Sequence, residues 1–153
     1  ADQGRGDTGT AEGGEVMERI QLSRAKGWKL PPNTVSVARG PRRIWGNPFT
    51  IADAVEVAQV RPDRAQRFVV ECFGHWLRGD RQNWMGPESD AAAALILARL
   101  PELRGKNLAC WCKIISHDGY VPCHADVLLS LANDIPMEEV IRENTRRAEG
   151  ETL

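Results

Sequence analysis

One part of the chain concentrates sulfur chemistry, because three of its cysteines and a histidine fall within 15 residues: Cys110, Cys112, Cys123 and His124. Residues two apart on a strand point to the same face, so Cys110 and Cys112 should share one side of a strand predicted over 107–112. Cys123 opens a helix predicted over 123–132, where unpaired N–H groups and the helix dipole lower the pKa of a thiol. The spacing therefore predicts that the thiols and the imidazole form one cluster.

Three interpretations of this cluster are open. In the first, Cys123 is a nucleophile or an anion-contacting thiol, His124 or Asp126 transfers protons, and Cys112 completes the catalytic set. In the second, Cys110, Cys112, Cys123 and His124 bind zinc tetrahedrally, although this spacing differs from that of the common zinc knuckles. In the third, the thiols are small buried apolar groups. We adopt the first, which needs no cofactor, and keep zinc as its alternative.

A second group of residues is basic. Between residues 17 and 49 Lys and Arg dominate, Glu18 is the only acid, and two tryptophans lie among them. Guanidinium groups bind phosphate through charge-assisted hydrogen bonds, and aromatic rings stack on a flat base. The predicted ligand-binding residues come from this stretch and its W-G-N-P-F loop: Arg39, Arg42, Arg43, Trp45 and Asn47. They favour a nucleotide-like or phosphorylated small molecule. The same composition suits single-stranded nucleic acid, and a solvated basic face would explain it as well.

Strands are predicted where β-branched and apolar residues alternate. T-V-S-V-A at 34–38 and N-L-A-C-W-C at 107–112 are the clearest, and 19–22 is a candidate third strand. The loops 39–49 and 113–122 follow the two clear strands. In parallel sheets ligands bind beyond the carboxyl ends of strands, so both loops should lie at the ligand-binding edge.

Helices are predicted from apolar residues at helical spacing. One is expected over 64–77 with Asp63 as its cap, another over 90–100 with Ser89 as its cap, and a third over 123–132. Strands that alternate with helices indicate a small single-domain α/β protein, a Rossmann-like layer fold with a mainly parallel sheet flanked by helices.

Length and composition agree with one globular domain. The chain has 153 residues, a formal net charge of −1 and 42% hydrophobic residues. We predict a disordered tail over 1–16, an α/β domain over 17–136, and a peripheral C-terminal helix and tail over 137–153. The start of the chain lacks the features of a signal peptide, and no stretch approaches the roughly 18–20 apolar residues of a membrane span. A cytoplasmic protein with free thiols and no membrane partner is expected.

Three stretches resemble a family found in phages and bacteria, the domain-of-unknown-function family numbered 4326. They are G-W-K-L-P-P-N-T-V-S-V-A-R-G at 27–40, W-G-N-P-F at 45–49, and the segment 103–133 with C-W-C and C-H-A-D. The resemblance covers most of residues 19–133 and implies no particular reaction. Members of the family have a short link between C-W-C and C-H-A-D, whereas the link here is longer and includes His117, Asp118, Gly119 and Tyr120.

These observations predict a hydrolase or transferase that acts on a nucleoside-like, nucleotide-like or phosphorylated substrate. Small Rossmann-like folds often act on nucleosides, so hydrolysis or transfer at a glycosidic bond is the first reaction to test, an argument by analogy only. The alternatives are a zinc-stabilised module that binds nucleic acid and a non-catalytic structural or adaptor domain.

Overall fold

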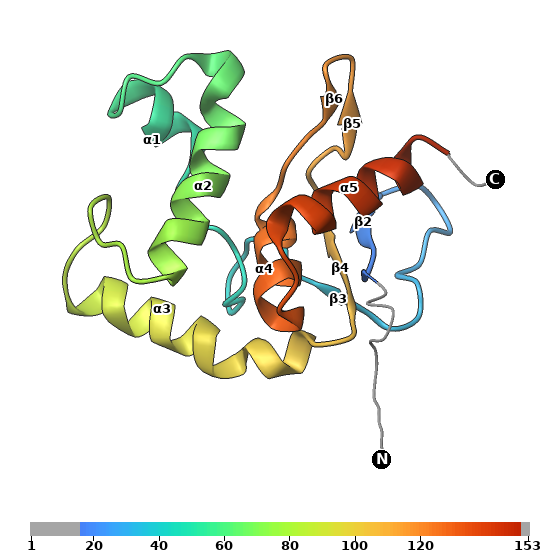
Figure 1. Ribbon diagram of the computed structural model, residues 1–153, viewed down its shortest axis with the longest axis horizontal. Coiled ribbons are helices and arrows are strands. Elements are labelled where there is room, and N and C mark those ends of the chain that lie inside the picture. Colours follow the sequence, from blue (N-terminus) through green and yellow to red (C-terminus); the bar gives the residue numbers. More distant parts are fainter. Residues whose placement is uncertain (1–15, 151–153) are drawn as a thin grey trace.

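A small parallel sheet lies at the centre of the protein. The computed structural model describes residues 16–150, in which three strands pair in the order β2-β4-β3 (Figure 1). The strands are β2 (Arg19–Gln21), β3 (Thr34–Ser36) and β4 (Asn107–Cys110). Ile20 lies opposite Ala109, and Val35 lies opposite Leu108. All three strands run in the same direction, so their carboxyl ends meet at one edge.

Helices and a hairpin complete the described part of the chain. The helices are α1 (Ile51–Glu56), α2 (Ala65–Leu77), α3 (Pro87–Arg99), α4 (His124–Asn133) and α5 (Met137–Ala148), with short 3-10 turns at Pro62–Arg64 and Leu100–Leu103. The hairpin pairs β5 (Ile115–Ser116) with β6 (Gly119–Tyr120). The prediction of a mixed α/β domain with a parallel sheet is thereby confirmed. None of the helices described here is long and apolar enough to cross a membrane.

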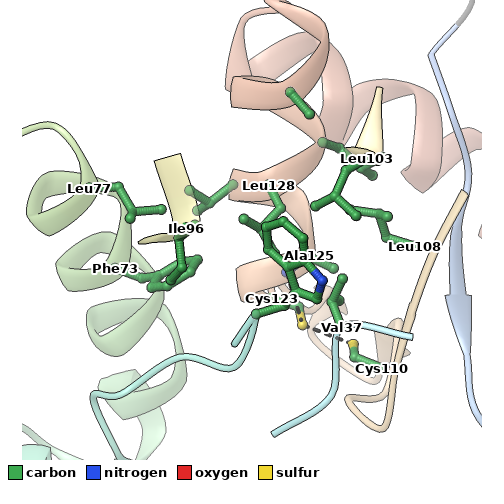
Figure 2. Packing of buried hydrophobic residues seen from close by; sticks show 14 of the residues in the cluster. Val37, Phe73, Leu77, Ile96, Leu103, Leu108, Cys110, Cys123, Ala125 and Leu128 are labelled. Carbon is green, nitrogen blue, oxygen red and sulfur yellow. Dashed lines mark hydrogen bonds between the residues drawn. The ribbon is translucent and has the colours of Figure 1, made fainter. Parts of the chain in front are cut away.

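The hydrophobic core fills the space between α2, α3, α4 and β4. Figure 2 shows Phe73, Ile96, Leu128 and Leu108 converging from these four elements. Each of the four side chains is at most 3% exposed. Cys110 belongs to the same cluster, so the sulfur site is continuous with the core rather than separate from it.

The C-terminal helix is tied to the edge strand β2. The backbone N–H of Arg19 donates to Oδ1 of Asn144 at 3.0 Å, and Nδ2 of Asn144 donates to the carbonyl of Met17 at 3.3 Å. Arg147 donates to the carbonyl of Val16, which is buried. The helix predicted within 137–153 is present over 137–148. The predicted tail over 1–16 lies outside the described residues except for Val16.

Both predicted helix caps are wrong. α3 begins at Pro87 with Gly86 as its N-cap, and Ser89 lies inside the helix, fully buried. Its hydroxyl accepts from Nε1 of Trp76 at 2.8 Å and donates to the carbonyl of Trp84, so it serves the core. Asp63 lies within a 3-10 turn, and α2 begins two residues later.

The strands are shorter than predicted, and the loop between C-W-C and C-H-A-D is more ordered. The strand expected over 34–38 ends at Ser36, and the one expected over 107–112 ends at Cys110. The segment 113–122, predicted as a loop, contains the β5–β6 hairpin. Because β4 ends early, the last two residues of C-W-C bend away from the sheet.

Candidate functional site

The three cysteines of the predicted cluster do come together. Cys110 is the last residue of β4, Cys112 lies in the bend that follows, and Cys123 is the N-cap of α4. Their Sγ atoms all lie within 4.8 Å of one another, and those of Cys110 and Cys123 are 3.0 Å apart (Figure 2). All of the cysteines are free thiols. Cys110 and Cys123 are buried, whereas Cys112 is half-buried.

His124 is adjacent to the cluster but fixed in another hydrogen bond. Its Nε2 lies 2.7 Å from the carbonyl oxygen of Val37, and since a carbonyl only accepts, Nε2 carries the proton. Nδ1 then carries no proton and lies 3.4 Å from Sγ of Cys123. Burial lowers the pKa of His124, which favours the neutral ring. The imidazole therefore holds β3 and α4 together, with one free nitrogen directed at a buried thiol.

Mutual hydrogen bonds and burial shift the pKa values of the three thiols in different directions. Hydrogen bonds from the thiols of Cys110 and Cys123 lower the pKa of Cys112 to about 2. The same contact with Cys112 raises the pKa of Cys110 to about 11. Hydrogen bonds to Cys110 and Cys112, and burial, raise the pKa of Cys123 well above its usual value. These pKa shifts favour a thiolate at Cys112, the sulfur nearest to solvent, over the thiolate predicted at Cys123.

A pocket of about 290 Å³ opens beside Cys112. The pocket lies beyond the carboxyl ends of β3 and β4. Of its lining residues, Arg39 follows β3, Cys110 is the last residue of β4, and Cys112 comes two residues later. The lining residues are Ala38, Arg39, Asn47, Phe49, Ile51, Gln66, Val69, Val70, Cys110, Trp111, Cys112 and His124. The pocket lies at the edge of the sheet where the loop positions predict a ligand, and it combines a guanidinium group, two amides and two sulfurs with an apolar wall.

The predicted ligand-binding residues separate into two groups. Arg39 lines the pocket and is exposed, whereas Arg42 and Arg43 are exposed but are not among the lining residues. Trp45 is buried in the core at 8% exposure. Asn47 reaches the pocket, but its side chain is engaged: Nδ2 donates to the carbonyl of Val69 at 2.9 Å, and Oδ1 accepts from the N–H of Phe49 at 2.9 Å. Asn47 therefore shapes the loop.

Gln66 and Trp111 are among the pocket residues that were not predicted. Nε2 of Gln66 donates to the carbonyl of Pro122 at 2.7 Å and lies 3.8 Å from Sγ of Cys112. Trp111 is 45% exposed, and the guanidinium of Arg24 lies 4.1 Å from the centre of its ring. The sequence could have identified Trp111 as a pocket residue only if the predicted strand had ended at Cys110, as β4 does.

A buried ion pair supports the cluster from behind. Arg19 and Asp126 have fully buried side chains, and Nη1 of Arg19 lies 3.2 Å from Oδ2 of Asp126. The carboxylate also accepts from the hydroxyl of Tyr120 at 2.7 Å and from the N–H of Cys123 at 3.0 Å. Arg19 donates in addition to the carbonyl of Lys113 at 2.8 Å. Asp126, predicted as an acid or base, thus caps α4 and is not among the lining residues of the pocket.

A second pocket of about 470 Å³ lies between α1 and α2, and its lining is mostly apolar. It shares Phe49 and Val69 with the first pocket. It has neither a basic residue nor a cluster cysteine, so we place the candidate site in the smaller pocket.

Fold and site together define a small α/β domain with a pocket and a three-cysteine cluster at the carboxyl edge of a parallel sheet. The chain belongs to the family described as Domain of unknown function (DUF4326), whose model matches residues 20–134. This match confirms the family resemblance seen in the sequence. The matched region contains all three cluster cysteines and the pocket, but it ends before α5 and begins one residue after Arg19. No curated protein and no solved structure matched the chain.

Proposed function

We propose that this protein is an enzyme that acts on a nucleotide-like or phosphorylated small molecule bound in the 290 Å³ pocket. The observation that carries the proposal is the meeting of Arg39, Gln66 and Cys112 on one concave surface. Concave sites with an apolar wall and a few convergent polar groups are typical of small-molecule binding. The proposal includes a Rossmann-like arrangement, in which the ligand lies beyond the carboxyl ends of the strands.

Arg39 is the group proposed to bind phosphate. Its guanidinium is exposed, and its hydrogen bond to the carbonyl of Phe49 is long, at 3.4 Å. An incoming anion can therefore replace that bond with a stronger, charge-assisted one. Val69 and Val70 provide the apolar wall against which a sugar or base would pack.

The cysteine cluster is proposed to supply the reacting group, through Cys112. Cys112 lines the pocket and carries the anionic sulfur, whereas Cys123 is buried and accepts from the N–H of Ala125 as the cap of α4. Gln66 positions the sulfur from the side of α2. Hydrolysis or transfer at a glycosidic bond is the reaction to test first, an assignment by analogy with other small folds that bind ligands at this edge.

The nucleic-acid alternative has less support. Of the basic stretch, Arg19 is buried in an ion pair and Arg24 lies over the ring of Trp111, while Trp45 is in the core. Those side chains are then not free to bind a strand, and a compact ligand in the pocket explains the exposed position of Arg39 better.

The test is a binding screen with nucleoside monophosphates, ribose 5-phosphate and inorganic phosphate, followed by product analysis for any compound that binds. Arg39→Ala should abolish binding, and Arg42→Ala should leave it unchanged, because only Arg39 lines the pocket. Equal losses in the two variants, or no binding of any phosphorylated compound, would contradict the proposal.

A further inference from the structure

We propose that Cys110, Cys112 and Cys123 bind one zinc ion whose fourth coordination position opens onto the pocket. The binding of the ion stands on the geometry of the cluster alone. The role of the open position rests on the proposed function, and in the zinc-bound protein the group at that position would replace the Cys112 sulfur as the reacting group.

The separations of the sulfurs fit a tetrahedral ion. Ligands at a Zn–S distance of about 2.3 Å in a tetrahedron lie about 3.8 Å apart. All three sulfurs lie within 4.8 Å of one another, so an ion can reach each of them if Cys110 and Cys123 separate slightly from their 3.0 Å contact. The three ligands are thiols, which select zinc and other soft metals over magnesium or calcium.

Two of the three ligands, Cys112 and Cys123, are held by groups outside the cluster. The N–H of Ala125 faces Sγ of Cys123 at 3.5 Å, and Nε2 of Gln66 faces Sγ of Cys112 at 3.8 Å. Nη2 of Arg19 lies 3.4 Å from the carbonyl oxygen of Cys112, which holds the bend after β4. Three thiolates and Zn²⁺ leave one negative charge, and N–H donors and a nearby guanidinium are the supporting groups that such a charge requires.

His124 is not the fourth ligand, although the sequence suggested it. The group of side chains close enough to share an ion contains the three cysteines and no histidine among residues 16–150. Nε2 of His124 donates to the carbonyl of Val37, and the ring is held against Phe73 with centroids 5.7 Å apart. Nδ1 of His124 faces Sγ of Cys123 at 3.4 Å, but it does not lie within 4.8 Å of all three sulfurs.

The fourth position then faces the pocket. Cys110 and Cys112 both line it, so the open side of an ion on the cluster lies towards the cavity and Arg39. Three protein ligands with one open position is the pattern of catalytic zinc, whereas structural zinc sites are closed by four. A zinc ion there would act as a Lewis acid on a water or substrate oxygen, next to the group that binds phosphate.

Metal content and cobalt spectroscopy of the full chain test the inference. Protein purified under reducing conditions without chelator should contain one zinc per chain, measured by elemental analysis and by native against denatured mass. After zinc removal, Co²⁺ should give an intense sulfur-to-cobalt absorption and a tetrahedral visible band. Cys112→Ser should weaken metal binding at least 100-fold. A chain that stays free of metal with all thiols reduced, or an iron-containing chromophore in place of zinc, would overturn the proposal.

Three further variants separate metal ligation from folding. Cys123→Ser removes a ligand but keeps an N-cap, since serine caps helices well, so it should fold and lose the metal. Cys72→Ser alters a cysteine outside the cluster and should keep one zinc per chain. His124→Asn should also keep the metal, and loss of zinc in this variant at full helix content would mean that His124 is the fourth ligand.

The two proposals can fail separately. If zinc does not bind but nucleotides still bind through Arg39, the metal inference is wrong and the pocket assignment stands. If cobalt binds but no phosphorylated compound changes its visible band or binds the protein, the metal site is real and the proposed function is wrong.

Discussion

The buried pair of Arg19 and Asp126 gives the sharpest prediction about stability. Asp126→Asn should lower the free energy of unfolding by about 3–5 kcal/mol, because it leaves the guanidinium of Arg19 charged, fully buried and without its counter-ion. The shape of the side chain is conserved. The remaining amide oxygen can still accept from the N–H of Cys123, and the new NH₂ can donate to the oxygen of Tyr120. The loss is therefore one of charge, and it is large against a typical total of about 5–15 kcal/mol.

Two variants separate the charge from the hydrogen bonds. Tyr120→Phe removes the hydrogen bond that the Tyr120 hydroxyl donates to the carboxylate of Asp126 at 2.7 Å. This change should lower the free energy of unfolding by about 1.5–3 kcal/mol. Arg19→Met combined with Asp126→Asn removes both members of the pair, so its cost should be smaller than the sum of the two single changes. Urea unfolding followed by circular dichroism measures the wild-type protein, the single variants Asp126→Asn, Tyr120→Phe and Arg19→Met, and the double variant. Chelator and reductant are present throughout, so that metal binding does not contribute.

Two results would contradict a stabilising role for the buried ion pair. One is a loss of less than about 1 kcal/mol in the free energy of unfolding of Asp126→Asn, and the other is a double variant whose loss equals the sum of the losses of its two single variants. Either result would mean that water reaches the pair. A change in the slope of unfolding against urea, without a change in midpoint, would instead point to an altered denatured state.

Three more outcomes follow from the structure. Gly46→Ala places a Cβ 2.8 Å from Cα of Arg39, so it should destabilise the protein by about 1–3 kcal/mol in urea unfolding, whereas Gly40→Ala meets only the flexible side chain of Arg43 and should be nearly neutral. In metal-free protein, iodoacetamide should alkylate Cys112 first, because Cys112 lines the pocket and its pKa is lowered. Peptide mapping over time should show that the buried Cys110 and Cys123 react only on unfolding, and early alkylation of Cys123 would contradict the assignment of Cys112 as the reactive thiol. Asn144→Ala should lower the free energy of unfolding by about 1–3 kcal/mol, because it removes the hydrogen bonds between α5 and the chain at β2. The control Arg142→Ala changes an exposed residue and should lower it little, and equal unfolding midpoints for the two variants would show that the Asn144 contacts do not hold the helix.

The sequence patterns that succeeded are local. Alternating β-branched residues at 34–36 and a buried run at 107–110 mark strands, and the short segment 19–21 pairs beside the second of them. The sequence could also predict that Cys110, Cys112 and Cys123 lie close together. A strand end and the start of the next helix lie at one edge of a parallel sheet, whatever the details of packing.

The ion pair could not be predicted, because its members are 107 residues apart in the sequence. Arg19 has the composition of a phosphate-binding residue, and only the packing of α4 beside the sheet directs it to Asp126. Tyr120 belongs to the link between C-W-C and C-H-A-D, and it completes the same network. The link therefore has a structural use in this chain: it supplies the hydroxyl that satisfies a buried carboxylate.

The exchange of roles between Cys123 and Cys112 has a more general physical cause. A helix N-terminus favours a thiolate, which is why Cys123 is the candidate from sequence. Three sulfurs in contact cannot all be charged, however, and a charge is least costly where solvent and donors reach it. Cys123 is fully buried, whereas Cys112 is half-buried and lies 3.8 Å from Nε2 of Gln66, and the pKa of Cys112 is lowered while that of Cys123 is raised. A single anionic sulfur beside two protonated ones is also the arrangement from which one soft cation can displace two protons.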